Sequence, residues 1–205
     1  SEVKVNKISP SSGTAFTIGD SGDTFTVPSG ATIVNSGTAT GFGGGKILQV
    51  RSTTWDDRFS DTTVSPSWID ITGASLAITP ASTSNNILIF ISLGVGCTDS
   101  VFIKLQHNGS GSYADVSGAV SDEASTNQQD ITFGAASQSA AYLLNTSYLF
   151  HDAPSKDSAF TYQLQGAKRN AGTWVVNGST DTTDNTYVPC GTSSITLMEL
   201  DGTGA

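Results

Sequence analysis

The chain has 205 residues, 13 % of them charged, and a formal net charge of −9 at pH 7. This length is sufficient for one large domain or two small ones, each with a buried core. Binding of nucleic acid through its phosphates needs clustered Lys and Arg, whereas here only Lys168 and Arg169 are adjacent. We therefore expect no nucleic-acid partner.

No apolar run approaches the roughly 18 residues that a membrane helix needs, so membrane insertion is not expected. The N-terminal sequence SEVKVNKISP lacks the apolar centre of a signal peptide, and no cleaved export signal is expected. Cys97 and Cys190 are too few for a disulfide scaffold. Two small buried hydrophobic residues are the simpler interpretation, and whether they pair stays open.

Residues 1–12 place Val3, Val5 and Ile8 among charged side chains and end in Pro-Ser-Ser. The alternation is typical of a short strand or arm that docks on another surface. We expect residues 1–12 to be an anchoring arm.

Residues 13–42 repeat one short pattern three times, an apolar–Thr–apolar triplet, or a shortened form of it, followed by a Gly-containing turn. Strands this short cannot enclose a core, and such a repeat needs neighbours to stack on. We predict a stalk of three chains wound around one axis; the alternative is a β-meander packed on the main domain. In the stalk, five apolar side chains would form the trimer interface: Phe16, Ile18, Phe25, Val27 and Ile33.

Gly43-Gly44-Gly45 is typical of a flexible joint, and we place the domain border at 43–45. Residues 46–205 then show strand patterns at the regular spacing of an all-β domain. The expected strands are 46–52, 68–72, 75–79, 86–93, 101–107, 143–151, 160–166, 173–177 and 194–200, with weaker candidates at 113–116 and 131–133. Eight to ten strands without a helix predict an antiparallel jelly-roll head.

The strongest strand pattern is NILIFISL at 86–93. It is apolar on both faces, and such a strand is buried on both. One face is expected to fill the core of the head, and the other to meet a partner subunit. We assign Ile87, Ile89 and Ile91 to the trimer interface.

Candidate catalytic and metal-binding residues are sparse. His107 and His151 are the only histidines, and no Gly-x-Ser-x-Gly motif or His/Cys ligand spacing accompanies them. Asp56-Asp57 and the Asp-rich run 181–185 offer oxygen ligands for Ca²⁺, but they lack a calcium-loop pattern and are interpreted as turns. We predict a non-enzymatic protein with no catalytic residue, metal site or cofactor.

Residues 110–141 are polar and weakly patterned, which is typical of recognition loops on a rigid β scaffold. Trp55 lies in a polar stretch, TTWDDRF, where an exposed ring could stack on a sugar. The candidate receptor-facing residues are Trp55, Tyr113, Gln128 and Gln129.

Several stretches carry a family resemblance. They are GTAFTIGDSGDTFTVPSGATIVNSG (13–37), GGGKILQV (43–50), SWIDITGASLAITPAS (67–82), NNILIFISLGVG (85–96), LLNTSYLFHDAPS (143–155) and AGTWVVNGSTDTTDNTYVPCGTSSITLMEL (171–200). Together they resemble small virion and tail-fibre proteins of marine bacteriophages, including cyanophages and pelagiphages. The resemblance covers nearly the whole chain and is weakest at 97–141. It implies a virion protein that is a homotrimer with a tumour-necrosis-factor-like jelly-roll head.

The resemblance leaves the place in the virion open. A receptor-binding tail fibre would use residues 1–12 to bind a tail adaptor or nozzle and would present its loops to a host surface glycan. A capsid decoration or cement protein, or a head fibre, would use the same arm to bind the major capsid protein at three-fold positions. Only about a dozen residues precede the repeat, fewer than tail fibres of this kind generally have, which favours decoration, whereas the polar loops favour recognition. A polysaccharide-degrading spike is a third interpretation, and the trimeric fibre is the one we favour.

Overall fold

The computed structural model describes residues 8–32, 34, 46–122, 128–183 and 186–202. Contacts between Cα atoms divide the chain into two units, Ser1–Phe42 and Gly43–Ala205, and each unit is described by itself. The predicted Ile33 contact, the glycine joint at 43–45 and most of the predicted arm at 1–12 lie outside the described residues.

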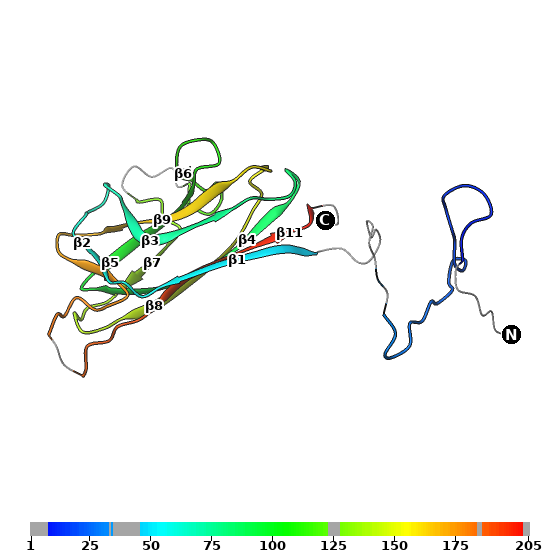
Figure 1. Cartoon of the computed structure of the whole chain (residues 1–205). Helices are drawn as coiled ribbons and strands as arrows, with labels where there is room; N and C mark the ends of the chain where they lie inside the picture. The colour runs from blue at the N-terminus through cyan, green and yellow to red at the C-terminus, as the bar shows by residue number, and fades with distance from the viewer. Residues whose placement is uncertain (1–7, 33, 35–45, 123–127, 184–185, 203–205) are drawn as a thin grey trace. The chain divides into compact units, whose positions relative to one another are not determined.

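The second unit is built from antiparallel strands in two sheets (Figure 1). One sheet contains β1 (Ile47–Trp55), β2 (Phe59–Asp61), β4 (Asn86–Cys97), β8 (Leu144–Asp152), β10 (Trp174–Val176) and β11 (Ser193–Leu200). The other contains β3 (Ile69–Ile78), β5 (Ser100–His107), β6 (Ala114–Asp115), β7 (Phe133–Ala136) and β9 (Phe160–Lys168). No α-helix occurs in the described part of the chain.

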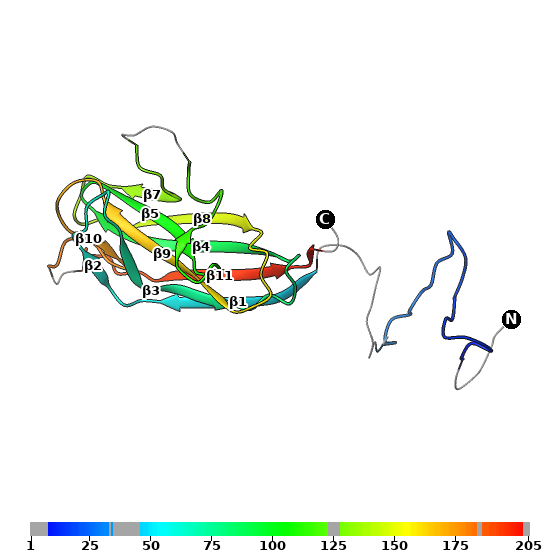
Figure 2. The same cartoon turned by 90° about the horizontal axis from the view of Figure 1, so that it is seen from above.

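The pairing of the longer strands identifies the fold. In the six-stranded sheet β1 pairs with β11, β11 with β4, and β4 with β8, so these four strands lie side by side (Figure 2). In the five-stranded sheet β3 pairs with β9, β9 with β5, and β5 with β7. The first long strand therefore pairs with the last, the second with the next to last, and so on inward. This nested order is that of a jelly roll, and the predicted all-β jelly-roll fold is confirmed.

The core lies between the two sheets and follows from strict alternation along the strands. In β4 the side chains of Ile87, Ile89 and Ile91 are at most 2 % exposed. Trp174 of β10 is fully buried, and a Cβ atom added to Gly166 of β9 would lie 2.2 Å from its ring. A glycine is needed at position 166 because the indole occupies the space of any larger side chain.

A buried carboxylate fixes one end of the sandwich. Glu199 of β11 is fully buried and accepts hydrogen bonds from the side-chain amides of Gln49 and Asn85 and from the backbone N–H of Ala81. Gln49 also donates to the backbone carbonyl oxygen of Thr79, at 2.7 Å. These contacts join β1, β11 and the β3–β4 loop. Burial acts to raise the pKa of Glu199, but the three hydrogen bonds outweigh it and hold the pKa below its usual value.

Two details of the head differ from the sequence prediction. The strands expected at 68–72 and 75–79, with a turn at Gly73, are one strand, β3, whose register on β9 shifts between Asp70 and Ser75. Gly73 has a φ of 86°, which indicates a local irregularity in the strand rather than a hairpin. The short strand β2 was not predicted from the sequence.

In the first unit the predicted turns are present, but the predicted short strands are not. The backbone N–H of Asp23 donates to the carbonyl oxygen of Asp20, and that of Ala31 to the carbonyl oxygen of Pro28. No strand forms within residues 8–32, because nothing in a single chain offers these triplets a neighbouring strand. Four apolar side chains of the predicted stalk are exposed: Phe16, Ile18, Phe25 and Val27.

Candidate functional site

The outer face of the six-stranded sheet carries an apolar patch. Phe90 of β4 lies opposite Leu149 of β8, and these side chains are 41 % and 54 % exposed. In the neighbouring row, Leu88 of β4 lies between Met198 of β11 and His151 of β8, and Val50 of β1 lies beyond Met198. We call Val50, Leu88, Phe90, Leu149 and Met198 the outer apolar patch. Clustered apolar side chains on a sheet surface are typical of a protein–protein contact.

The rest of this face is polar. The row that follows Phe90 and Leu149 along the strands consists of Thr54, Ser194, Ser92 and Ser147. Beyond it, Gly94 pairs with Asn145. The outer apolar patch is therefore confined to the half of the face where β4 begins and β8 ends.

The structure corrects the assignment of Ile87, Ile89 and Ile91 to a trimer interface. All three point between the sheets and belong to the core of the chain itself. The opposite face of the same strand, which carries Leu88 and Phe90, is the outer face of the sheet. The sequence prediction chose the wrong face because residues 87–91 are apolar on both faces of β4.

Trp55 is also placed differently from the prediction. It is the last residue of β1, is half-buried and packs against the core. Its indole Nε1 is buried and has no hydrogen-bond partner among the described residues. The ring lies against Gly73, where an added Cβ would be 3.2 Å from Trp55 Cδ1. Trp55 is therefore a packing residue and does not face a receptor.

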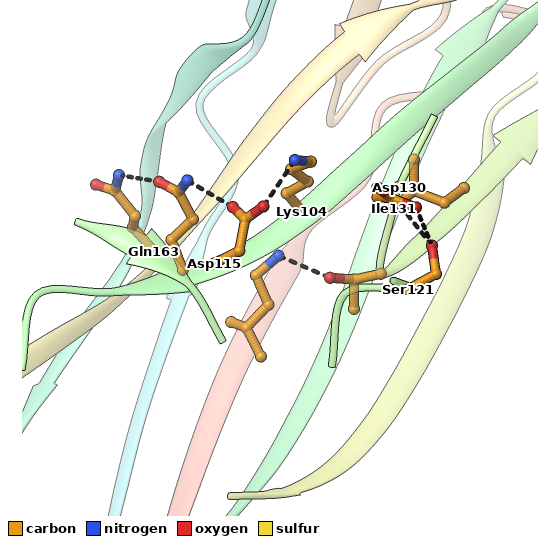
Figure 3. Close-up of polar contacts among 9 residues, drawn as sticks. Lys104, Asp115, Ser121, Asp130, Ile131 and Gln163 are labelled. Atoms are coloured by element: carbon orange, nitrogen blue, oxygen red, sulfur yellow. Dashed lines mark hydrogen bonds and ion pairs between the residues drawn. The ribbon is translucent and has the colours of Figure 1, made fainter. Parts of the chain in front are cut away.

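The outer face of the five-stranded sheet is polar and hydrogen-bonded across its strands (Figure 3). Lys104 Nζ donates to Asp115 Oδ2 at 2.7 Å, and the Gln106 amide donates to Asp115 Oδ1 at 2.8 Å. The Gln163 amide donates to Gln106 Oε1 at 3.2 Å and to Asp70 Oδ1 at 3.1 Å. These contacts link β3, β9, β5 and β6.

An aromatic ring lies beside this polar row. Lys104 Nζ lies 4.7 Å from the centre of the Trp68 ring, in a cation–π contact. Gln165 donates a hydrogen bond to Asp70 Oδ1 at 2.7 Å and continues the row along β9. Amides, carboxylates and a ring edge on one face are chemically suited to a hydroxyl-rich ligand.

Three predicted receptor-facing residues lie on exposed loops. Tyr113, in the loop between β5 and β6, is 42 % exposed. Gln128 and Gln129 are exposed and line a cavity of about 520 Å³ together with Ser65, Phe102 and Arg169. The structure brings the two glutamines together and leaves Tyr113 outside this cavity.

Arg169 is the residue of this cavity that sequence reasoning did not select. It follows β9 directly, and it also lines a second cavity, of about 330 Å³, with Thr98, Asp99, Ser100, Ala136, Ser137 and Gln138. Its side chain is 62 % exposed, and its Nη1 lies 3.8 Å from Asp99 Oδ1. The one sequence feature that pointed to it is that Lys168-Arg169 is the only adjacent basic pair.

The other candidate residues have structural partners. His107 Nδ1 accepts a hydrogen bond from the Gly109 backbone N–H, and its ring packs edge-on against Phe160 and Tyr162. Asp181 accepts hydrogen bonds from the backbone N–H and the hydroxyl of Thr183, which lower the pKa of its carboxyl, as in an Asx turn.

Neither cysteine forms a disulfide, and burial raises the pKa of the Cys97 thiol, whereas Cys190 is exposed. The described residues contain no group of three or more His, Cys, Asp or Glu that could hold a metal ion. They also contain no helix long and apolar enough to cross a membrane.

Comparison with known proteins gives no family assignment. No family model matches the chain, and no curated protein sequence matches it. Among solved structures, the chain is similar to the VP2 subviral particle of infectious bursal disease virus, with 12 % identity and a TM-score of 0.30 over 75 % of this chain and 40 % of that one. The T=1 particle of that virus gives 11 % identity and a TM-score of 0.34 over 76 % of this chain and 36 % of that one.

The Gt strain of the same virus gives 10 % identity and a TM-score of 0.34, over 75 % of this chain and 40 % of that one. The chain thus spans about two fifths of the length of the chains that it matches. Similarity at this level supports no conclusion about function, and the fold assignment above depends on the strand order alone.

Proposed function

We propose that this protein is a non-enzymatic virion structural protein, a homotrimeric fibre that attaches the particle to a host surface. The observation that carries the proposal is the outer apolar patch, where Phe90 of β4 and Leu149 of the neighbouring strand β8 are exposed side by side. A second copy of the chain placed against this face would remove these side chains from water, at a gain of about 25 cal/mol per Å² of apolar surface.

The first unit supports the same arrangement. Phe16, Ile18, Phe25 and Val27 are exposed apolar residues that a single chain does not bury. Stacking of three copies would give each short triplet a neighbouring strand and would place these side chains around a common axis. The sequence resemblance to marine phage fibre proteins supports a trimer with the head in a tumour-necrosis-factor-like arrangement.

The proposed roles of the remaining parts follow from this assembly. Residues 1–12 would bind another virion protein, either a tail adaptor or nozzle protein or the major capsid protein. The polar loops of the head would face outward, to a host surface glycan. In this proposal the protein acts through assembly and binding and not through catalysis.

The mass of the purified protein in solution, measured by light scattering at micromolar concentration, tests the assembly. We expect the mass of a trimer, about three times 21.1 kDa. Phe90→Asp should yield monomers or unfolded chains, because a partner would bury three unpaired carboxylates. Thr72→Asp adds the same charge at an exposed position of β3 on the other sheet and should remain a trimer. A stable folded wild-type monomer would contradict the proposal.

The number of copies per particle tests the place in the virion. A few trimers, located at the tail by antibody labelling and electron microscopy, are expected for a fibre. Hundreds of chains distributed over the shell would instead identify a capsid decoration protein. Hydrolysis of capsule or lipopolysaccharide by the purified protein would contradict the non-enzymatic assignment.

A further inference from the structure

Arg169 lies where two cavities of the head meet. It lines the 520 Å³ cavity together with Gln128, Gln129 and Phe102, and the 330 Å³ cavity together with Ser100. Because one side chain contributes to both, a ligand longer than a single small molecule can occupy both cavities and contact Arg169 at its centre. Cavities of this size are typical of small-molecule and saccharide sites.

The backbone of Arg169 is fixed, while its guanidinium keeps free donors. Its backbone N–H donates to the carbonyl oxygen of Ser100 at 2.9 Å. The 3.8 Å distance from Nη1 to Asp99 Oδ1 is too long for a hydrogen bond. Asp99 also accepts hydrogen bonds from the backbone N–H of Ser100 and the side-chain amide of Asn170. A guanidinium has five N–H donors. The described residues leave most of those of Arg169 available to a ligand.

Two basic side chains, Lys168 and Arg169, lie next to each other at this position in an acidic protein. Lys168 is only 2 % exposed, and its Nζ donates to Thr98 Oγ1 at 3.2 Å, beside the second cavity. Asp99 is the only acidic residue among the described residues that line either cavity. Arg169 is the one basic residue among the same lining residues, and the buried Lys168 adds a second positive charge beside Thr98, in a chain whose net charge is −9. An anionic group is therefore favoured at Arg169.

The remaining lining groups are chemically suited to hydroxyl groups. Gln128, Gln129 and Gln138 offer amide donors and acceptors, and Ser65 offers a hydroxyl. Phe102 offers a half-buried ring to the larger cavity. Amides that donate and accept, together with one ring and one guanidinium, match the alternating hydroxyl and C–H faces of a sugar that carries a carboxylate.

We propose that the two cavities that share Arg169 form a binding site for an acidic saccharide. The guanidinium binds the carboxylate of a uronic-acid-type sugar, and the Gln128 and Gln129 amides bind hydroxyls of the same chain. This assignment rests on the proposed host-surface function and specifies the chemical class of the ligand. It also locates the site on the head, at the end of β9 and away from the outer apolar patch.

The test uses polygalacturonate as the acidic probe and dextran as the neutral one, with binding to the purified full-length protein measured by isothermal titration calorimetry. At about 0.15 M salt the Debye length is about 8 Å, so repulsion from distant carboxylates is screened while a direct contact is not. We expect the wild type to bind polygalacturonate and not dextran. Arg169→Gln should weaken polygalacturonate binding about 10- to 100-fold, which is typical of a lost charge-assisted hydrogen bond.

Two further variants complete the design. Arg51→Gln removes the same charge from an exposed position on edge strand β1 and should bind as the wild type does. Gln128→Ala should weaken binding several-fold without a change in net charge. The proposal is overturned if the wild type does not bind polygalacturonate, or if it binds polygalacturonate and dextran with equal affinity. It is also overturned if Arg169→Gln binds polygalacturonate as tightly as the wild type does, or if Arg51→Gln loses as much affinity as Arg169→Gln.

Failure of this inference is distinguishable from failure of the proposed function. Light scattering on the same samples reports the trimer, and copy number reports the place in the virion. A trimeric fibre whose Arg169→Gln variant still binds polygalacturonate would refute the site alone. A monomer that binds polygalacturonate through Arg169 would refute the assembly alone.

Discussion

Replacement of Glu199 by Gln tests whether the buried carboxylate at the end of the sandwich stabilises the head. The substitution keeps the shape of the side chain but turns one of its two acceptor oxygens into a donor. The remaining oxygen can still accept from Ala81 and Asn85, which both donate to Oε1. The new NH₂ group then faces the Gln49 amide, which cannot turn over, because it also donates to the Thr79 carbonyl oxygen.

The substitution replaces one charge-assisted hydrogen bond by a contact between two buried donors. This change should lower the free energy of unfolding by about 1.5–3 kcal/mol. For a domain of roughly 150–250 residues, each kcal/mol lowers the melting temperature by about 2–4 °C. Glu199→Gln should therefore melt about 3–12 °C below the wild type at pH 7, as measured by circular dichroism. Asp157→Asn removes an exposed carboxylate from the β8–β9 loop and should change the melting temperature by less than about 2 °C.

The pH dependence gives a second readout. The folded-state pKa of Glu199 lies below its ordinary value of 4.5, so the carboxylate contributes stability above that value and loses it as the pH falls through the folded pKa. The difference in melting temperature between the wild type and Glu199→Gln should thus be largest at pH 7 and shrink below about pH 4.5. A difference that is absent at pH 7, or that does not change with pH, would refute the reasoning.

Three other changes have defined outcomes. Tyr162→Phe removes the hydroxyl that donates to Asp152 and leaves a nearly buried carboxylate without that donor. It should lower the free energy of unfolding, measured by urea denaturation, by about 1.5–3 kcal/mol. An unchanged denaturation midpoint would contradict this role. Gly166→Ala forces a Cβ into the Trp174 ring and should destabilise the head by about 1–3 kcal/mol with a shift in tryptophan fluorescence, whereas wild-type stability would show that the ring can move. Deletion of residues 1–12 should leave the head folded but abolish incorporation into particles, as measured by immunoblotting; normal incorporation would place the anchor elsewhere.

Alternation of side chains predicted most of the fold. Strands β9 and β11 alternate apolar and polar residues, and β4 is a continuous apolar run, so their positions followed from the sequence to within a few residues. Strand β2 has only three residues and pairs only with β10, so no local pattern could reveal it. The error at β3 arose because a glycine inside a strand and a glycine in a turn give the same sequence pattern.

The candidate sites were less predictable, because they depend on which face of a strand turns inward. Residues 87–91 are apolar on both faces of β4, and only Asn86 and Ser92 marked the Leu88–Phe90 face as the outer one. Trp55 was assigned to a loop because polar residues surround it, whereas β1 continues up to that residue and its ring lies over Gly73. Arg169 shares its cavity with Gln128, about forty positions earlier, and no local pattern encodes that proximity.

The pairing of the first long strand with the last has a consequence for synthesis of the protein. Partners in β1 and β11 lie more than 130 positions apart in the sequence, so β1 has no hydrogen-bonded partner strand until β11 has left the ribosome. Until then β4 also lacks β11 on one edge, and Glu199 is not yet present to join the β3–β4 loop to β1. A prematurely terminated chain therefore cannot close the six-stranded sheet. Only a chain translated through Leu200 therefore completes the sheet face on which Met198 lies beside Leu88.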